Sequence, residues 1–474
     1  MSLAPDTTGL LLSPAGPSPH PTDLEPSLVG SRTYRTRRRF TRIDASGLLS
    51  IMIFLLMLIP ARLILQSLSD VGRPAVLFAI GLWCWWVLVR FNPRLMVGGP
   101  QPMRWIVLIY LVALLISYAA GYWRGLTAME ANGADRAILA ALAFTGVILT
   151  AADGIPNWDR LRGVLRTLVW CAGVVGFLGL VQFVFWFDFT QYIALPGLSS
   201  NGVEPGFELR GGAIRVASTM THYIEFSTVM AMSLPFAIHF ARFAPARHSR
   251  QLFMVTALII AAAIPATVSR TGFVAVGIAL LVMIPVWTWR MRYNLAVIAV
   301  TLVAGLLVMR PALANTLLNL FAGAGEDSSI TARTKRYEMV GYYFSQRPWW
   351  GRGTGTWISP QYQFLDNQWL AQALSTGLIG VAALASLHLT AIVLAFVALR
   401  RSPSGEDRHL CAALIATQLI ALVVAAFFDS LSFSTYTMVL ALMVGLTGAV
   451  WRLTHPARVV RTTLPLRSAG PLSN

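Results

Sequence analysis

The residues best suited to chemistry gather between Arg333 and Gly380. This stretch reads RTKRYEMVGYYFSQRPWWGRGTGTW and, after a short interval, LDNQWLAQALSTGLIG. It is dense in arginine, aromatic residues and glycine, whereas the segments around it are apolar. Polar loops beside apolar spans are where functional groups concentrate, so we expect the chemistry of the chain here, with anionic partners for the arginines.

The elements that position these residues follow from composition. Hydrophobic residues make up 56% and charged residues 12% of the 474, and mean hydropathy is +0.64. These values exclude a water-soluble domain and predict an all-α polytopic membrane bundle of about 12 transmembrane helices. The apolar runs lie near 46–66, 74–90, 105–121, 136–152, 163–186, 222–240, 251–268, 272–289, 294–309, 370–398, 410–427 and 433–451.

Basic residues set the expected orientation. Arginine clusters follow alternate runs, which places both termini in the cytoplasm. We therefore expect a multi-pass protein of a bacterial cytoplasmic membrane, with a disordered basic tail over 1–45, a transmembrane domain over 46–451 and a second basic tail over 452–474. The net charge of +17 is accounted for by these loops, so no nucleic acid partner is expected. The three cysteines lie inside apolar runs and indicate neither a disulfide framework nor a metal site.

Two long connections should lie outside, 187–221 and 310–368, the second partly helical and joining helices 9 and 10. Arginines here oppose the usual charge bias, so they are candidates for function. Salt bridges to acids of the same loops are an alternative explanation. The arginines of the two loops are Arg210, Arg215, Arg333, Arg336, Arg347 and Arg352, Arg270 is a further external arginine, and the acids of the loops are Glu204, Glu208, Glu326, Asp327 and Glu338.

Arg270 occupies a short turn, Ser269 to Gly272, at the start of a span. A guanidinium group beside the free N–H groups of a helix N-terminus would form a phosphate site. The alternative is an arginine that reaches the lipid headgroups beside an ordinary Ser/Thr cap.

Three motifs together resemble the O-antigen ligase and polysaccharide polymerase superfamily of membrane glycosyltransferases. The Ser-Arg-Thr-Gly turn is the first, and the Arg215 to His222 segment resembles the family's entry to the helix after the first large loop. The third is Asp366-Asn367, followed by nine residues, Gly377 and then Gly380, after the glycine-rich run 348–355. The family has a histidine where this chain has Asp366.

The resemblance implies a glycosyltransferase that moves or polymerises a glycan from a polyprenyl-pyrophosphate donor to an acceptor hydroxyl on the outer face of the membrane. It implies no cofactor and no metal; the partners are the lipid-linked glycan donor, a glycan or lipid acceptor and membrane lipid. Arginine side chains would stabilise the pyrophosphate leaving group, and a general base would accept the acceptor proton. The expected catalytic residues are Asp366, Arg270 and Arg215. The expected substrate-binding residues are Arg210, His222, Arg333, Arg336, Arg352 and Asn367.

Several alternatives stay open. Asp366 could instead cap the following helix, as could Asn367, and Glu208, Glu225 and His222 are rival bases. The tryptophans and tyrosines of the loop could stack on sugars or lie in the interfacial aromatic belt, while Gly377 and Gly380 resemble helix-packing residues.

A transporter or flippase of lipid-linked saccharides is the alternative function. Such a protein would also have about twelve helices, but it should show internal repeats and charged or broken segments near the membrane midplane. The sequence shows no internal repeat, and its polar residues cluster at the expected outer side.

Overall fold

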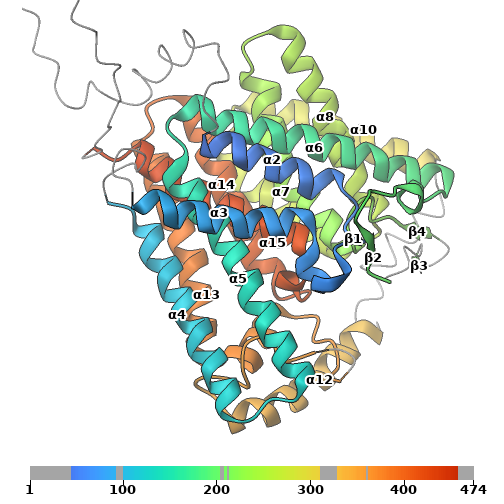
Figure 1. Cartoon of the computed structure of the whole chain (residues 1–474). Helices are drawn as coiled ribbons and strands as arrows, with labels where there is room; N and C mark the ends of the chain where they lie inside the picture. Colours follow the sequence, from blue (N-terminus) through green and yellow to red (C-terminus); the bar gives the residue numbers. More distant parts are fainter. Residues whose placement is uncertain are drawn as a thin grey trace, which may run out of the picture.

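The fold is built almost entirely from helices. The computed structural model describes residues 44–91, 100–202, 208–210, 213–309, 328–358 and 361–456. Figure 1 shows the helices as one bundle. Their bounds are α2 Ala45–Leu58, α3 Pro74–Arg90, α4 Pro102–Trp123, α5 Ala128–Gly154, α6 Trp158–Phe185, α7 Tyr223–Phe243, α8 Arg247–Ala266, α9 Arg270–Met283, α10 Trp289–Met309, α12 Ser328–Gln346, α13 Gln368–Arg401, α14 Gly405–Val424 and α15 Ser434–Leu453.

The strands are short and lie at one end of the bundle. Two antiparallel pairs occur among the described residues, β1 Leu63–Ile64 with β2 Ser199–Ser200, and β3 Glu208–Arg210 with β4 Ala213–Arg215. The 3₁₀ turns are η2 Gln66–Gly72, η3 Phe189–Tyr192, η4 Ile284–Val286 and η6 Ser430–Ser432.

The prediction of a polytopic all-α membrane fold is confirmed. Eight helices of the described part are long and apolar enough to cross a membrane, namely α4, α5, α6, α7, α8, α13, α14 and α15. Three shorter apolar helices cover 45–58, 74–90 and 270–286, and α10 occupies the remaining predicted run. Each of the twelve apolar runs therefore forms a helix. The predicted tails fall almost wholly outside the described residues, as do 310–327 of the second long connection.

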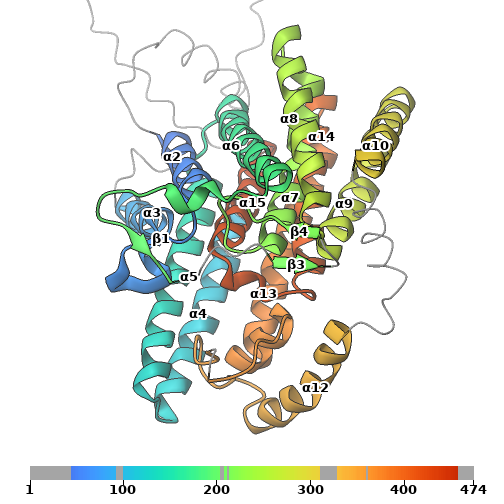
Figure 2. The ribbon, with the colours of Figure 1, turned by 90° about the vertical axis from the view of Figure 1, so that its right-hand side faces the viewer.

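The centre of the bundle is α15. Nearly every residue of this helix is buried, and it packs against α5, α7, α13 and α14 (Figure 2). Small residues allow the close approach, since Gly445 and Gly448 face Ala151 and Ala152 of α5. Apolar side chains on every face suit a helix enclosed by other helices.

Paired charges mark one end of the bundle. Asp153 at the end of α5 binds Arg104 at the start of α4, with 2.8 Å between oxygen and nitrogen, and also binds Arg90 at the end of α3. Arg162 near the start of α6 binds Asp407 near the start of α14 at 2.6 Å. These arginines belong to the loops predicted to be cytoplasmic, and the structure gathers them at one end through acidic partners.

The α4–α5 hairpin projects at the opposite end, and the glycine-rich segment lies between it and α12 (Figure 2). Thr127 and Glu130 form a reciprocal capping box at the start of α5, which fixes the turn between the two helices. The hairpin therefore forms a wall beside the segment that follows α12.

Candidate functional site

A break in α13 shapes the site. Gly377 has φ 64° and ψ −166°, so the helix divides into 368–376 and a long second part. The glycine-rich run before the helix pairs with the free backbone groups: Gly353 N donates to Ser375 O at 3.0 Å, and Leu378 N donates to Pro348 O at 2.8 Å. Because the loop satisfies the groups that the break exposes, the first part of α13 is held in place by backbone contacts.

Glycine is required on both sides of this contact. A Cβ atom on Gly377 would lie 2.4 Å from the carbonyl of Trp349, and one on Gly351, where φ is 71°, would lie 2.3 Å from Ser375 O. Both positions also have a left-handed backbone that disfavours other residues. The residues between Asp366 and Gly377 thus form one short half-helix, which ends at the break.

Asp366 lies at the free end of this half-helix. Its Oδ2 accepts a hydrogen bond from Nη1 of Arg336 on α12 at 2.6 Å, and its side chain is 44% exposed. The cap of α13 is Asn367, whose Oδ1 accepts from the N–H groups of Trp369 and Leu370 at 3.0 and 3.2 Å. The capping role considered for Asp366 thus belongs to Asn367, and the Asp366 carboxylate remains accessible.

A second carboxyl group, Asp429, supports this segment from the connection between α14 and α15. Its oxygens accept from Asp366 N at 3.1 Å and Asn367 N at 2.9 Å. Burial raises the pKa of the Asp429 carboxyl, while the backbone N–H donors oppose the rise. Sequence reasoning missed Asp429. The sequence feature that could have indicated it is the single acidic residue in the short connection between the last two apolar runs.

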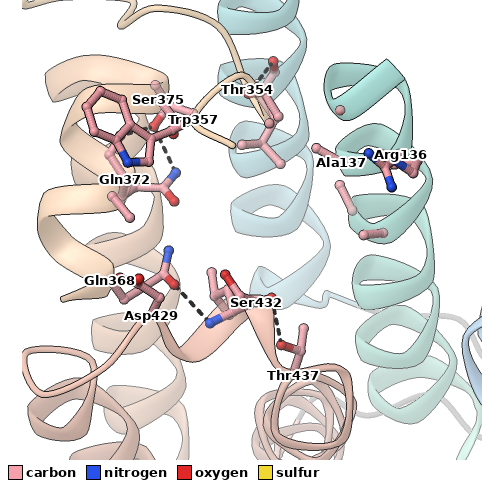
Figure 3. A pocket seen from close by; sticks show the side chains of 18 of the residues that line it. Arg136, Ala137, Thr354, Trp357, Gln368, Gln372, Ser375, Asp429, Ser432 and Thr437 are labelled. Atoms are coloured by element: carbon pink, nitrogen blue, oxygen red, sulfur yellow. Dashed lines mark hydrogen bonds between the residues drawn. The ribbon is translucent and has the colours of Figure 1, made fainter. Parts of the chain in front are cut away.

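The half-helix, the α4–α5 hairpin and the α14–α15 connection enclose a cavity of about 470 Å³. Figure 3 shows its polar lining: Gln368, Gln372 and Ser375 on α13, Asp429, Ser432 and Thr437 beside them, Arg136 on α5, and Thr354 and Trp357 on the glycine-rich segment. Gln368 also ties two walls together, because its Oε1 accepts from Leu431 N at 2.9 Å.

Arg215 contacts the turn that precedes Arg270. Nη2 of Arg215 donates to Val268 O at 3.3 Å, and its guanidinium lies 3.4 Å from the ring centroid of Tyr223. Val268 has φ 49° and stands two residues before Arg270, the first residue of α9. The structure thus brings Arg215 against the turn that carries Arg270.

The two rival bases that the structure describes are engaged with helix ends. His222 caps α7 by accepting from Ile224 N at 3.2 Å through Nδ1. Glu225 is fully buried, and its oxygens accept from Thr221 N, Thr435 N and Tyr436 N at 2.9 to 3.1 Å. The side chain of Glu208 is outside the described part.

The α14–α15 connection links the two groups of candidates. Phe433, which ends it, packs against His222 with 5.6 Å between the ring centroids and the rings tilted by 45°. Asp429, four residues earlier, accepts hydrogen bonds from Asp366 N and Asn367 N. One short segment therefore touches both the Arg215 side and the Asp366 side of the site.

Arg352 fastens the glycine-rich segment to the hairpin. Its Nη2 donates to the Tyr362 hydroxyl at 2.8 Å and lies 3.7 Å from Oε1 of Glu130, while its carbonyl accepts from Nε of Arg124 at 2.7 Å.

Arg333 lies on α12 and Arg210 on β3, but the side chains of both are outside the described part. The described residues contain no cluster of three or more His, Cys, Asp or Glu side chains that could hold a metal ion.

Residues 255–385 match the family model described as O-Antigen ligase. Over this segment the chain is similar to the O-antigen ligase family. The segment runs from α8 into α13 and includes Arg270, Arg336, Asp366 and the break at Gly377, which confirms the resemblance seen in the sequence. Arg215, His222 and Asp429 lie outside the matched residues. No curated protein matches the chain.

Proposed function

We propose that this protein transfers or polymerises a glycan from a polyprenyl-pyrophosphate donor onto an acceptor hydroxyl at the outer face of the cytoplasmic membrane. The observation that carries the proposal is the accessible carboxylate of Asp366, paired with Arg336 and seated on Asp429, within the segment that is similar to the O-antigen ligase family. This pair lies beside the cavity that Asp429 lines.

In the proposed reaction, the bond between the anomeric carbon and the phosphate oxygen breaks as the acceptor oxygen forms its new bond to that carbon. Electrons of the broken bond pass to the pyrophosphate, whose charge Arg215 and Arg270 stabilise. Asp366 accepts the proton of the acceptor hydroxyl, and Arg336 orients its carboxylate. Asp429 acts as a positioning residue, because it binds the backbone of Asp366 rather than the reactants. The reaction requires no cofactor or metal in this scheme.

Glycan analysis of cells that lack the protein tests the proposal. Membrane lipid extract and envelope polysaccharide would be separated by size, with complementation by wild type, Asp366→Ala, Arg270→Ala and Arg215→Ala. Short lipid-linked repeats without long polymer would identify a polymerase, and full-length chains stranded on lipid would identify a ligase. Unchanged glycans in every strain would contradict the proposal.

A further inference from the structure

We infer that the cavity between the α4–α5 hairpin and the half-helix of α13 binds a saccharide of the acceptor, separate from the pyrophosphate of the donor. The inference rests on the proposed function and names the substrate part that this hollow receives. Its volume of about 470 Å³ falls within the range of roughly 300–1,000 Å³ that small-molecule sites occupy.

Unused hydrogen-bonding groups line the cavity. Gln368 and Gln372 are each only 6% exposed. Gln368 uses its Oε1 for Leu431 N, and Gln372 uses its Nε2 for Thr376 Oγ1, so within the described part the amide NH₂ of Gln368 and the Oε1 of Gln372 have no partner. Both groups line the open cavity, and sugar hydroxyls, which donate and accept, are suited to bind both kinds.

Apolar and aromatic surface completes the lining. Tyr110, Phe144 and Trp357 contribute rings, and Leu114 contributes an aliphatic wall. Aromatic faces pack against the C–H surface of a sugar ring, while amides bind its hydroxyls. Polar groups spaced among apolar surface are therefore suited to a carbohydrate.

The charged residues that line the cavity differ from those that a donor pyrophosphate would require. Among the described lining residues Arg136 is the only arginine, and Asp429 adds a carboxyl group. A pyrophosphate would require several guanidinium groups and would be repelled by Asp429, whereas Arg215 and Arg270 supply such groups beyond the α14–α15 connection. Because Asp429 contacts the backbone of Asp366, a saccharide in the cavity would lie beside the proposed proton acceptor.

Two variants of the cavity test the inference. Ala140→Phe places a ring at a lining position of α5, and Gln372→Leu removes the amide at similar volume. Ala128→Phe makes the same change at an exposed residue of the same helix and serves as control. Full-length protein in lipid nanodiscs would be assayed with lipid-linked saccharide extracted from cells that carry the protein and with oligosaccharide released from their envelope. A dextran oligosaccharide of equal size is the unrelated probe.

Both cavity variants should raise the KM for the envelope oligosaccharide about tenfold, which corresponds to the loss of one or two good contacts. The KM for the lipid-linked donor and the behaviour of Ala128→Phe should match wild type. Direct binding of the oligosaccharide, measured by saturation-transfer NMR, should weaken in parallel, and dextran should not bind.

Other outcomes separate this inference from the proposed function. If both cavity variants transfer glycan with an unchanged KM for the acceptor, the cavity assignment is overturned and the proposed function stands. The same holds if the variants raise the KM for the donor instead. If the wild-type protein binds the oligosaccharide but performs no transfer, and both cavity variants weaken the binding, the cavity assignment is supported and the proposed function is overturned.

Discussion

Asp366 and Asp429 are two carboxyl groups with different neighbours and different tasks. Asp366 is partly exposed and bound to a guanidinium group, whereas Asp429 is largely enclosed and accepts two backbone N–H bonds. The exposed group can accept a proton from a substrate, whereas Asp429 lines the cavity and holds the backbone of Asp366 and Asn367.

Replacement of Asp366 by Asn should therefore remove transfer without unfolding the protein. We expect a decrease in kcat of about 10²- to 10⁴-fold, the usual contribution of a general base, with an unchanged elution profile in size-exclusion chromatography. Arg347→Gln, at an exposed arginine of the same loop, is the control and should retain activity. Full activity of Asp366→Asn would assign the proton to another group.

The raised pKa of Asp429 predicts opposite effects of pH on stability and on transfer. Between the ordinary aspartate pKa and the raised value, the folded protein binds more protons than the unfolded chain, so unfolding free energy falls as pH rises through this range. Transfer should rise over the same range, because ionised Asp429 accepts both N–H bonds that seat Asp366.

Asp429→Asn should flatten this acid limb of the pH–rate profile and lower kcat, since an amide offers one acceptor oxygen rather than two. Asp135→Asn, on the exposed side of the α4–α5 hairpin, should keep the wild-type profile. An acid limb that is unchanged in Asp429→Asn would show that another group titrates.

At the residue scale the sequence predicted part of the site. Arg336 and Asp366 were singled out separately, and the structure joins them. Asp429 was missed because its importance depends on backbone contacts with a segment 62 residues earlier, which no local pattern reports. Arg352 was predicted to bind substrate, and the structure shows it in contact with Tyr362 and Glu130; the prediction is not tested by these contacts.

Among the elements, α13 departs most from what its sequence predicts. Its apolar pattern indicated one continuous span over 370–398, and Gly377 was interpreted as a packing residue. The residue does pack closely, but it also breaks the helix, because the partner that completes the backbone hydrogen bonds is a loop more than twenty residues earlier. Each of the other apolar runs forms a helix, although α5 begins eight residues before the predicted run 136–152 and α9 ends six residues before the end of the predicted run 272–289.

Gly377→Ala should destabilise the protein and abolish transfer. A Cβ atom would contact the Trp349 carbonyl at 2.4 Å, and the left-handed backbone adds strain of about 1–3 kcal/mol. The midpoint of thermal unfolding, followed by size-exclusion fluorescence, should fall. Gly163→Ala on α6, where a Cβ would meet no atom within 4 Å, is the matched control, and equal stability of the two variants would contradict the account of the break.

For the whole molecule, the positions of the arginines bear on its orientation. The paired end, where Arg90, Arg104 and Arg162 bind Asp153 and Asp407, lies opposite the end that carries the candidate site. Positive-inside reasoning predicts that the paired end faces the cytoplasm.

Single cysteines would test this orientation in a Cys84→Ala background, because Cys84 is exposed whereas Cys171 and Cys411 are buried. A membrane-impermeant maleimide added to intact cells should label Trp349→Cys but not His248→Cys, since these exposed positions lie at opposite ends. Labelling of His248→Cys alone would invert the topology and place the site inside.

The backbone junction between the glycine-rich segment and the broken helix also determines how this protein can be recombined with relatives. Neither half of the junction is complete by itself, because each supplies main-chain donors or acceptors that the other lacks. A chimera that exchanges only the loop, or only the half-helix, would leave unmatched peptide groups at the crossover. Exchange of specificity should therefore succeed only when residues 347–380 are inherited as a single block.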